Sequence, residues 1–291
     1  MQSRVKRPHF VPRSYLGGFT DLPDRIWIYD KLEKNIRQQS IKDVAVVKDL
    51  YLNTKQVSPL DIVEVTALEG KAKRIIKNLE ERKLPNPAEL GHLLNFVALQ
   101  FLRTPAAGVR AHLAFAEFVS GLRKEYRRRK DIGRSTEGLE KIATDLLKDF
   151  KSPSNPIEFL SVDENSTPPI DHFVDTIVGE GYFITTILAK QNWTFLYSRP
   201  KSVFITSDDP FCVFDQNDSE NLRLIPLSPD TTKIIPLSKG LCLSIYDEGM
   251  GIRLKELKDS AVTIINQGIF DKASRYAFSG DKDCLEELAR L

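Results

Sequence analysis

The pattern of apolar residues changes near Asn192, and this change constrains the fold more than any other feature of the chain. Before Asn192, apolar residues recur at helical spacing in the stretches 58–82, 86–103, 106–130 and 135–150. After it, short β-rich runs separated by Asn, Asp, Pro and Gly occupy 193–198, 203–214, 222–229, 231–237 and 241–246. We therefore expect an α+β protein with a mainly helical body, a small N-terminal strand element and a C-terminal antiparallel sheet.

Composition adds further limits to this expectation. The chain has 291 residues, of which 41% are hydrophobic, and its net charge of +2 gives no overall attraction to nucleic acid. Its three cysteines form no CxxC pair, and no apolar run resembles a signal peptide or a membrane span. We expect a cytoplasmic protein with no membrane partner, in three segments (1–57, 58–190 and 191–291) of one compact domain. The oligomeric state stays open.

An acidic turn between two strand-like runs is the first candidate site. Val203–Ile205 and Phe211–Phe214 have the composition of buried strands, and Ser207, Asp208 and Asp209 lie between them, just before Pro210. Carboxylates at a strand end are common metal-binding or catalytic groups. The turn predicts a Mg²⁺ or Mn²⁺ site, to which Glu69 of the helix 58–82 could contribute. The alternative is an Asp that accepts hydrogen bonds from its own turn.

The helix 86–103 supplies the second group of candidates. Its sequence is apolar nearly all round, which is typical of a central, buried helix, yet it carries Gln100 and Arg103. Buried without partners, each would cost a few kcal/mol, and the Arg charge would cost more. We expect Arg103 to meet Asp208 or Asp209, either as a buried ion pair between two parts of the fold or within a site that binds a phosphate or carboxylate.

Two further features are local. Pro12 and the Gly17–Gly18 pair bracket a single helical turn that places Tyr15 for packing and leaves His9 at its entrance, where an imidazole could act as a general acid or base. The residues 123–130 contain six Lys or Arg in eight positions near the end of a predicted helix. Such a basic end either is solvated and stabilised by the helix dipole or contacts phosphates.

Five motifs, taken together, resemble a known family over nearly the whole chain. They are His9-Phe-Val-Pro-Arg-Ser-Tyr-Leu-Gly-Gly-Phe19, Ile26-Trp-Ile-Tyr-Asp-Lys31, Gln100-Phe-Leu-Arg-Thr-Pro105, Phe204-Ile-Thr-Ser-Asp-Asp-Pro210 and Ile225-Pro-Leu-Ser-Pro229. In this order they resemble the bacterial domain of unknown function family 4238. The resemblance implies a prokaryotic cytoplasmic protein and supplies no reaction. The positions to which it points are His9, Tyr15, Gln100, Arg103, Ser207 and Asp208. Asp209 departs from the Asn that is common before the Pro.

Two functions from different classes follow, and the sequence leaves open whether the protein is an enzyme. In the first, a phosphodiesterase or nuclease-like effector of bacterial stress or phage defence acts on nucleic acid or a nucleotide. There, His9, Arg103 and Asp208 are catalytic. Tyr15, Gln100 and Ser207 bind substrate, and Asp208, Asp209 and Glu69 hold a metal. In the second, a non-enzymatic sensor binds a small anion, and Arg103 and Asp208 form a structural lock.

Overall fold

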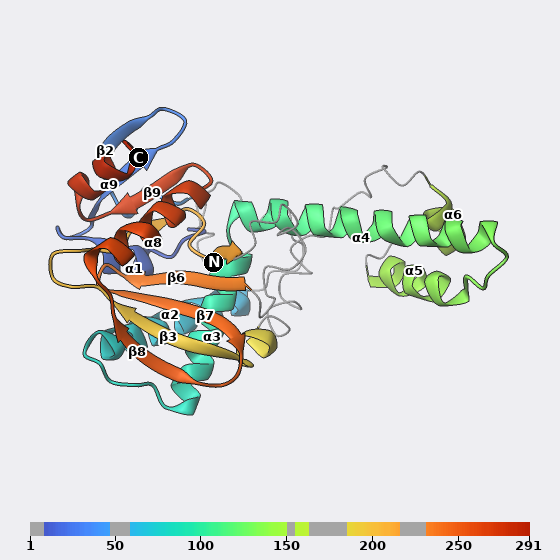
Figure 1. The fold of residues 1–291 in the computed structure, drawn as a ribbon, viewed down its shortest axis with the longest axis horizontal. Coiled ribbons are helices and arrows are strands. Elements are labelled where there is room, and N and C mark those ends of the chain that lie inside the picture. Colours follow the sequence, from blue (N-terminus) through green and yellow to red (C-terminus); the bar gives the residue numbers. More distant parts are fainter. Residues whose placement is uncertain (1–8, 47–58, 150–154, 163–184, 216–230) are drawn as a thin grey trace. The chain divides into compact units, whose positions relative to one another are not determined.

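A computed structural model describes residues 9–46, 59–149, 155–162, 185–215 and 231–291 (Figure 1). The chain divides into two compact units, one formed by Met1–Gly108 and Val174–Leu291 and the other by Val109–Phe173. The predicted strand 222–229 lies outside the described residues. Among the described helices, none combines the length and the apolar character that crossing a membrane requires.

The larger unit contains a four-stranded sheet that joins both ends of the chain. β1 alternates buried and half-buried residues, so that Ile26, Ile28 and Asp30 face the core. The described strands follow the order β2-β1-β9-β4, and each neighbouring pair is antiparallel. Their bounds are β1 Arg25–Asp30, β2 Asn35–Ser40, β4 Thr206–Ser207 and β9 Tyr276–Ser279.

A five-stranded sheet forms the second layer of the larger unit, with the described order β5-β6-β7-β3-β8. Its central strands β6, β7 and β3 are mostly buried on both faces, as expected for strands covered from two sides (Figure 1). β8 pairs with β3 in parallel, whereas the other pairs are antiparallel. The bounds are β3 Gln191–Tyr197, β5 Cys212–Asp215, β6 Thr231–Ser238, β7 Leu241–Glu248 and β8 Ile252–Glu256.

These sheets correct the fold expected from the sequence. The α+β class holds, but the expectation of a mainly helical body with a small N-terminal strand element is wrong, because the described strands form two sheets of four and five strands. A two-stranded hairpin cannot bury a face alone, and β1 therefore pairs with β9 from the other end of the chain. The C-terminal sheet is also not wholly antiparallel, since β8 runs parallel to β3.

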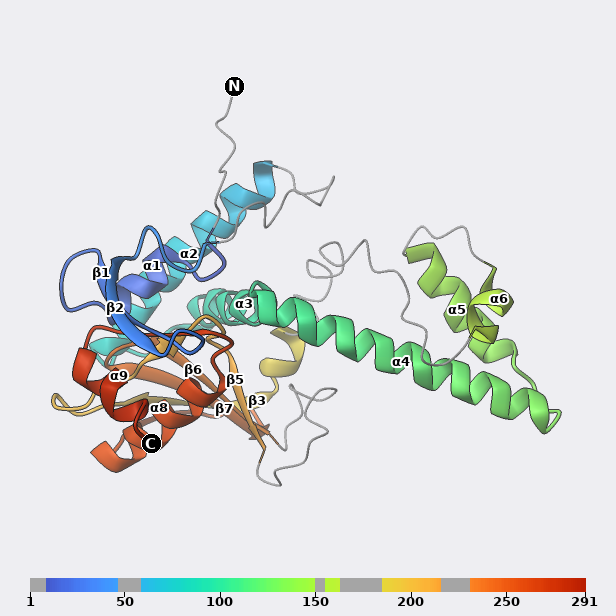
Figure 2. The same ribbon diagram turned by 90° about the horizontal axis from the view of Figure 1, so that it is seen from above.

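Helices cover the sheets of the larger unit on two sides. The first core brings α1, the 3₁₀ turn η1, α2 and α3 against the sheets, and it includes Tyr15, Phe19 and Phe96. The second core brings in α8 and α9, which lie beside each other next to the C-terminus (Figure 2). The bounds are α1 Arg13–Leu16, η1 Gly17–Phe19, α2 Pro59–Glu80, α3 Pro87–Leu102, α8 Asp259–Lys272 and α9 Lys282–Leu288. The predicted helical turn after Pro12 and the helices 58–82 and 86–103 are confirmed.

The smaller unit is helical within its described residues. Its core contains Leu122, Tyr126, Ala143 and Leu160, with Phe159 packed against it. The bounds of its helices are α4 Pro105–Asp131, which starts in the larger unit, α5 Glu137–Asp149 and α6 Pro156–Ser161.

Candidate functional site

The helix α3 positions the two polar residues that its sequence carries into the core. Asn86 caps its start by accepting the backbone N–H of Glu89 at 3.0 Å, while the Glu89 carboxylate accepts the N–H of Asn86. At the other end, Pro105 follows Thr104, so the helix stops at Leu102 with Arg103 as its C-cap. Arg103 and Thr104 thus project from a helix end whose position is fixed by buried apolar residues on the preceding turns.

Arg103 ties three segments together. Its Nη1 donates to Oε1 of Glu69 at 2.5 Å, and its Nε donates to the backbone carbonyl of His9 at 3.1 Å; Nη2 donates to the same carbonyl. The Arg103 side chain is 8% exposed and that of Glu69 18% exposed, so this ion pair is largely removed from water. The partner expected for Arg103 was Asp208 or Asp209; in the described residues its carboxylate partner is Glu69 instead.

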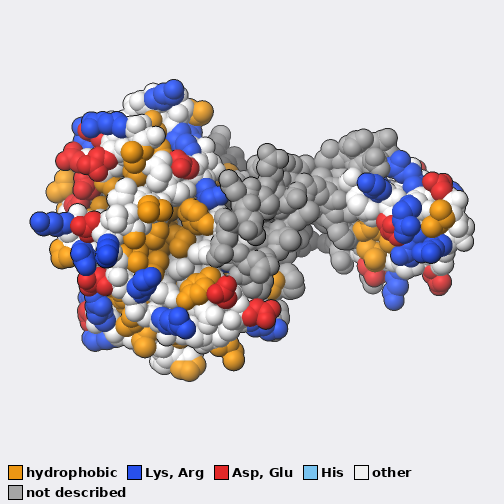
Figure 3. Space-filling model, viewed as in Figure 1, with side chains coloured by type: hydrophobic (Ala, Val, Ile, Leu, Met, Phe, Trp, Pro, Cys, Tyr) orange, Lys and Arg blue, Asp and Glu red, His pale blue; other side chains and the backbone are white. Residues whose placement is uncertain are grey.

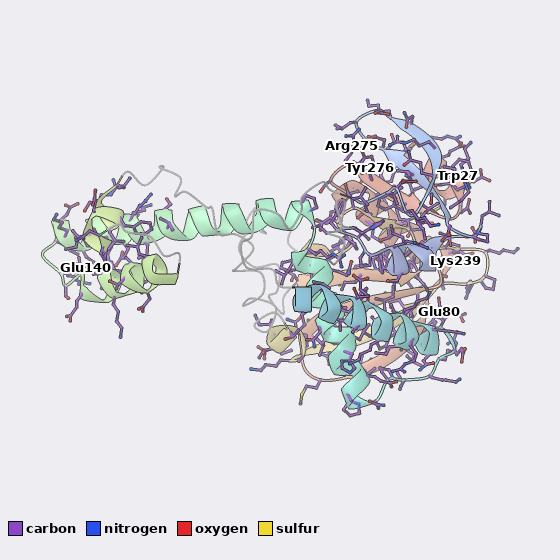
Figure 4. The ribbon with its side chains drawn as sticks, turned by 180° about the vertical axis from the view of Figure 1, so that it is seen from behind. Trp27, Glu80, Glu140, Lys239, Arg275 and Tyr276 are labelled. Atoms are coloured by element: carbon purple, nitrogen blue, oxygen red, sulfur yellow. The ribbon has the colours of Figure 1, made fainter. Side chains whose placement is uncertain are left out.

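Asp208 is bound by the backbone of a distant segment. Its carboxylate accepts the N–H groups of Ser274, Arg275 and Tyr276 at 2.9, 2.8 and 3.0 Å. Burial of this side chain raises the pKa of Asp208 above its usual value, although the three N–H groups act in the opposite direction. Arg275 and Tyr276 lie next to each other in Figure 4. The Asp208 carboxylate thus already has three hydrogen-bond donors within the protein.

Asp209 and Ser207 complete the same turn. The Asp209 carboxylate accepts the hydroxyl of Thr104 at 3.0 Å, which connects the turn to the end of α3. The Ser207 hydroxyl donates to the Asp209 carbonyl at 2.9 Å and accepts the Asp209 N–H at 3.2 Å. All three side chains of Ser207, Asp208 and Asp209 are buried. The acidic turn is therefore buried and hydrogen-bonded within the fold, and it is not an open loop.

The proposed metal ligands do not fit a metal centre in this geometry. Asp208 is bound by backbone N–H groups, Asp209 by Thr104, and Glu69 by Arg103. Across the part of the chain that the structure describes, no three His, Cys, Asp or Glu side chains are grouped so that they could hold a metal ion.

His9 is oriented by a main-chain carbonyl. Its Nε2 lies 3.2 Å from the carbonyl oxygen of Ile41, which can only accept, so Nε2 carries the proton and Nδ1 bears the lone pair. Burial lowers the pKa of His9 below 6.5, and the positive charges of Arg103 and Arg13 act in the same direction. The lowered pKa of His9 favours the neutral imidazole. For Nδ1, the described residues supply no hydrogen-bond partner.

Tyr15 and Gln100 differ sharply in how their polar atoms are used. The Tyr15 hydroxyl donates to the Pro236 carbonyl at 2.6 Å and lies 2.9 Å from the Thr206 hydroxyl. Burial raises the pKa of Tyr15 well above 10. Gln100 is fully buried, and neither its Oε1 nor its Nε2 has a hydrogen-bond partner among the described residues. Buried amides are nearly always paired, so this side chain requires an explanation.

The structure thus brings some of the predicted residues together and separates others. His9, Glu69 and Arg103 form one cluster, and Ser207 and Asp209 join it through Thr104, the neighbour of Arg103. Asp208 faces the segment 274–276 instead. Sequence reasoning missed Thr104 and Ile41 as partners. Thr104 carried a usable signal, because it stands between the predicted buried Arg103 and the helix-ending Pro105.

Comparison with known proteins agrees with the motifs noted in the sequence. The model of the family described as protein of unknown function (DUF4238) matches residues 7–283. No curated protein and no solved structure matched the chain. Because the match covers nearly all of its 291 residues, the chain belongs to the DUF4238 family.

Proposed function

We propose that this protein is a cytoplasmic binding or sensor protein that takes a small polar ligand through the side-chain amide of Gln100. The single observation that carries the proposal is that both polar atoms of this fully buried amide lack a partner among the described residues. An unpaired amide of this kind costs about 1–3 kcal/mol in a folded protein. A bound molecule that offers one acceptor and one donor would recover that free energy.

The charges around Gln100 limit the kind of ligand that can bind there. Arg103, one helical turn further along α3, is already neutralised by Glu69 and by the His9 carbonyl. Arg103 therefore offers no free positive charge that would favour a bare anion as the ligand. A glutamine amide pairs well with an edge that carries a donor beside an acceptor, as nucleobases and amides do. We infer a nucleobase-containing or amide ligand, with Arg103 and the Ser207–Asp209 turn acting as a lock that holds the surrounding elements.

The experiment is a thermal-shift screen of the full chain with nucleobases, nucleosides, nucleotides and simple amides, followed by calorimetry on each hit. Gln100→Met keeps the side-chain length and removes both polar atoms. Gln39→Met, on the half-buried strand β2, is the matched control. We expect a saturable ligand-dependent shift in the wild type and in Gln39→Met that is absent in Gln100→Met. An equal shift in all three proteins, or none in the wild type, contradicts the proposal.

A second candidate, the phosphodiesterase or nuclease-like effector of stress or phage defence, is supported by His9 alone. A neutral imidazole whose Nε2–H is held by a carbonyl, and whose Nδ1 is free within the described residues, has the form of a general base. Purified protein is incubated with mixed RNA and DNA, with Mg²⁺, with Mn²⁺ and with EDTA, beside His9→Gln. Cleavage that is lost in His9→Gln supports this candidate, and intact substrate under every condition contradicts it.

A further inference from the structure

The last turns of α4 and the turn after them carry many cationic residues that the Gln100 site does not use. Residues 123–134 contain seven Lys or Arg and only two Asp or Glu. Several Lys and Arg side chains are visible on the smaller unit in Figure 3. A helix C-terminus favours positive charge, but this effect is confined to its last turn. The number of cations here exceeds what helix stability requires.

Part of this charge has an internal role. Arg123 is buried; its Nε donates to the Phe159 carbonyl at 3.0 Å, and its guanidinium lies over the Phe159 ring. Arg128 and Arg129 both donate to Glu125, at 2.7 and 2.8 Å. Hydrogen bonds from Arg128 and then from Arg129 hold the pKa of Glu125 at about 2. Because one carboxylate serves two guanidinium groups, a positive charge is left over even at this pair.

Three exposed cations make no such contact in the part of the chain that the structure describes. The side chains of Lys124, Lys130 and Arg134 make no ion pair or hydrogen bond within the described residues. Lys130 lies in the last turn of α4, where the helix dipole accounts for it. Lys124 lies almost two turns earlier and Arg134 lies beyond the end of the helix, so the dipole explains neither of them.

The backbone fixes Arg134 close to the end of α4. Gly133 adopts a left-handed φ of 66°, and its N–H donates to the Lys130 carbonyl at 3.2 Å. The N–H of Arg134 donates to the Arg129 carbonyl at 2.8 Å, which completes the pair of bonds that ends many helices. The backbone of Arg134 is therefore held beside the last turn of the helix. The helical residues 124–131 extend over about 10 Å at the helical rise, and Arg134 lies beside the last turn.

We propose that Lys124, Lys130 and Arg134, together with Arg128, bind the phosphate backbone of a nucleic acid. A stretch of about 10 Å of duplex carries about six phosphate charges, which is enough to engage these four side chains. An anionic membrane is the less suitable partner, because a helix that lies in a membrane interface inserts an apolar face. Here the apolar side chains of Leu122 and Tyr126 on α4 are already buried in the core of the smaller unit.

The test is fluorescence anisotropy of the full chain with a labelled duplex of mixed sequence and with single-stranded RNA, between 50 and 200 mM salt. Lys124→Glu, Lys130→Glu and Arg134→Glu are combined in one variant. We expect its dissociation constant to rise at least tenfold. The magnitude of the slope of log K against log salt should fall by roughly 2.7, because three phosphate contacts are lost. The matched control combines Lys77→Glu, Lys190→Glu and Lys258→Glu, which reverse exposed charges of the larger unit.

Each remaining outcome also decides the proposal. A second triple variant with Gln at the same three positions should lose most of the binding while disturbing α4 less, as checked by circular dichroism. The proposal fails if the wild type does not bind at 50 mM salt, or if the control variant loses as much affinity. Binding to phosphatidylserine vesicles without binding to nucleic acid would assign a lipid surface instead. Gln100→Met should retain nucleic-acid affinity, so this result is separate from that of the Gln100 site.

Discussion

The carboxylate of Asp208 accepts the backbone N–H of Arg275 at 2.8 Å, and the Arg275 guanidinium pairs with the fully buried carboxylate of Asp30. The turn before β5, the segment before β9 and the end of β1 are therefore joined through one arginine. Arg37 approaches the same Asp30 oxygen at 3.4 Å from β2. This arrangement explains how the two termini of the chain are held in one sheet.

Replacement of Asp208 should be costly whatever its further role. Asp208→Ala leaves three partly buried N–H groups, those of Ser274, Arg275 and Tyr276, without their acceptor. We expect the free energy of unfolding to fall by about 2–4 kcal/mol in a urea titration. The free energy of unfolding of Asp208→Asn should lie between those of the wild type and Asp208→Ala, because its amide nitrogen, which cannot accept a hydrogen bond, would face one of these donors.

Glu248→Ala serves as the control for that titration, since Glu248 is exposed at the end of β7. It should change the free energy of unfolding by less than about 0.5 kcal/mol. Equal stabilities for Asp208→Ala and Glu248→Ala would mean that the three N–H groups find other partners, and that their hydrogen bonds to Asp208 have no energetic importance.

Asp30 should make the stability of the protein depend on acid pH. The hydrogen bond from Arg275 lowers the pKa of Asp30 to about 2 from 3.8. A lowered folded-state pKa stabilises the folded protein fully above pH 3.8, and that contribution disappears as the pH falls towards 2. The stability difference between the wild type and Asp30→Asn should thus be constant from pH 7 to 5 and should shrink between pH 5 and 2.

Urea midpoints of both proteins at each pH provide this comparison. Asp208, whose pKa is raised, contributes in the opposite direction, so that protonation at low pH favours the folded state through this residue. Since Asp208 is present in both proteins, its effect cancels in the difference. A difference that does not change with pH would exclude Asp30 as the source.

Much of the helical part of the fold could be predicted from the sequence because its signals are local. Ser58-Pro59 and Asn86-Pro87 mark helix starts, and Pro105 marks a stop, within a few residues of the observed bounds. The sheets were harder to predict from the sequence. β2 reads Asn-Ile-Arg-Gln-Gln-Ser, without the apolar alternation that identifies a strand, and it exists because β1 pairs with it.

The candidate site shows the same division between local and long-range information. That Gln100 and Arg103 would be buried followed from the apolar helix around them. Which acid meets Arg103 did not: Asp208 or Asp209 was expected, whereas the observed pairing with Glu69 depends on how α2 packs against α3. The three backbone donors to Asp208 lie in a segment with no motif of its own. Main-chain partners of this kind leave no trace in side-chain patterns.

The Arg103–Glu69 ion pair should show strong coupling in a double-mutant cycle. Arg103→Met removes the cation but leaves the Glu69 charge nearly buried, which we expect to cost about 3–5 kcal/mol. Adding Glu69→Leu removes that stranded charge, so the double variant should be more stable than Arg103→Met alone. Chemical denaturation of the four proteins gives the coupling energy. Additive effects would show that Glu69 is solvated and that the lock rests on the His9 carbonyl.

Gln100 should behave unlike other buried glutamines when its amide is removed. In the ligand-free protein, Gln100→Met replaces an unpaired amide by an apolar chain of similar length, so the free energy of unfolding should rise by about 1–3 kcal/mol. Gln191 is equally well buried, but its Oε1 accepts Lys233 at 2.7 Å, and Gln191→Met should therefore destabilise the protein. Thermal and urea unfolding of both variants tests this contrast. Destabilisation by Gln100→Met would mean that the amide already has a partner in the free protein, and the ligand proposed for it would lose its energetic basis.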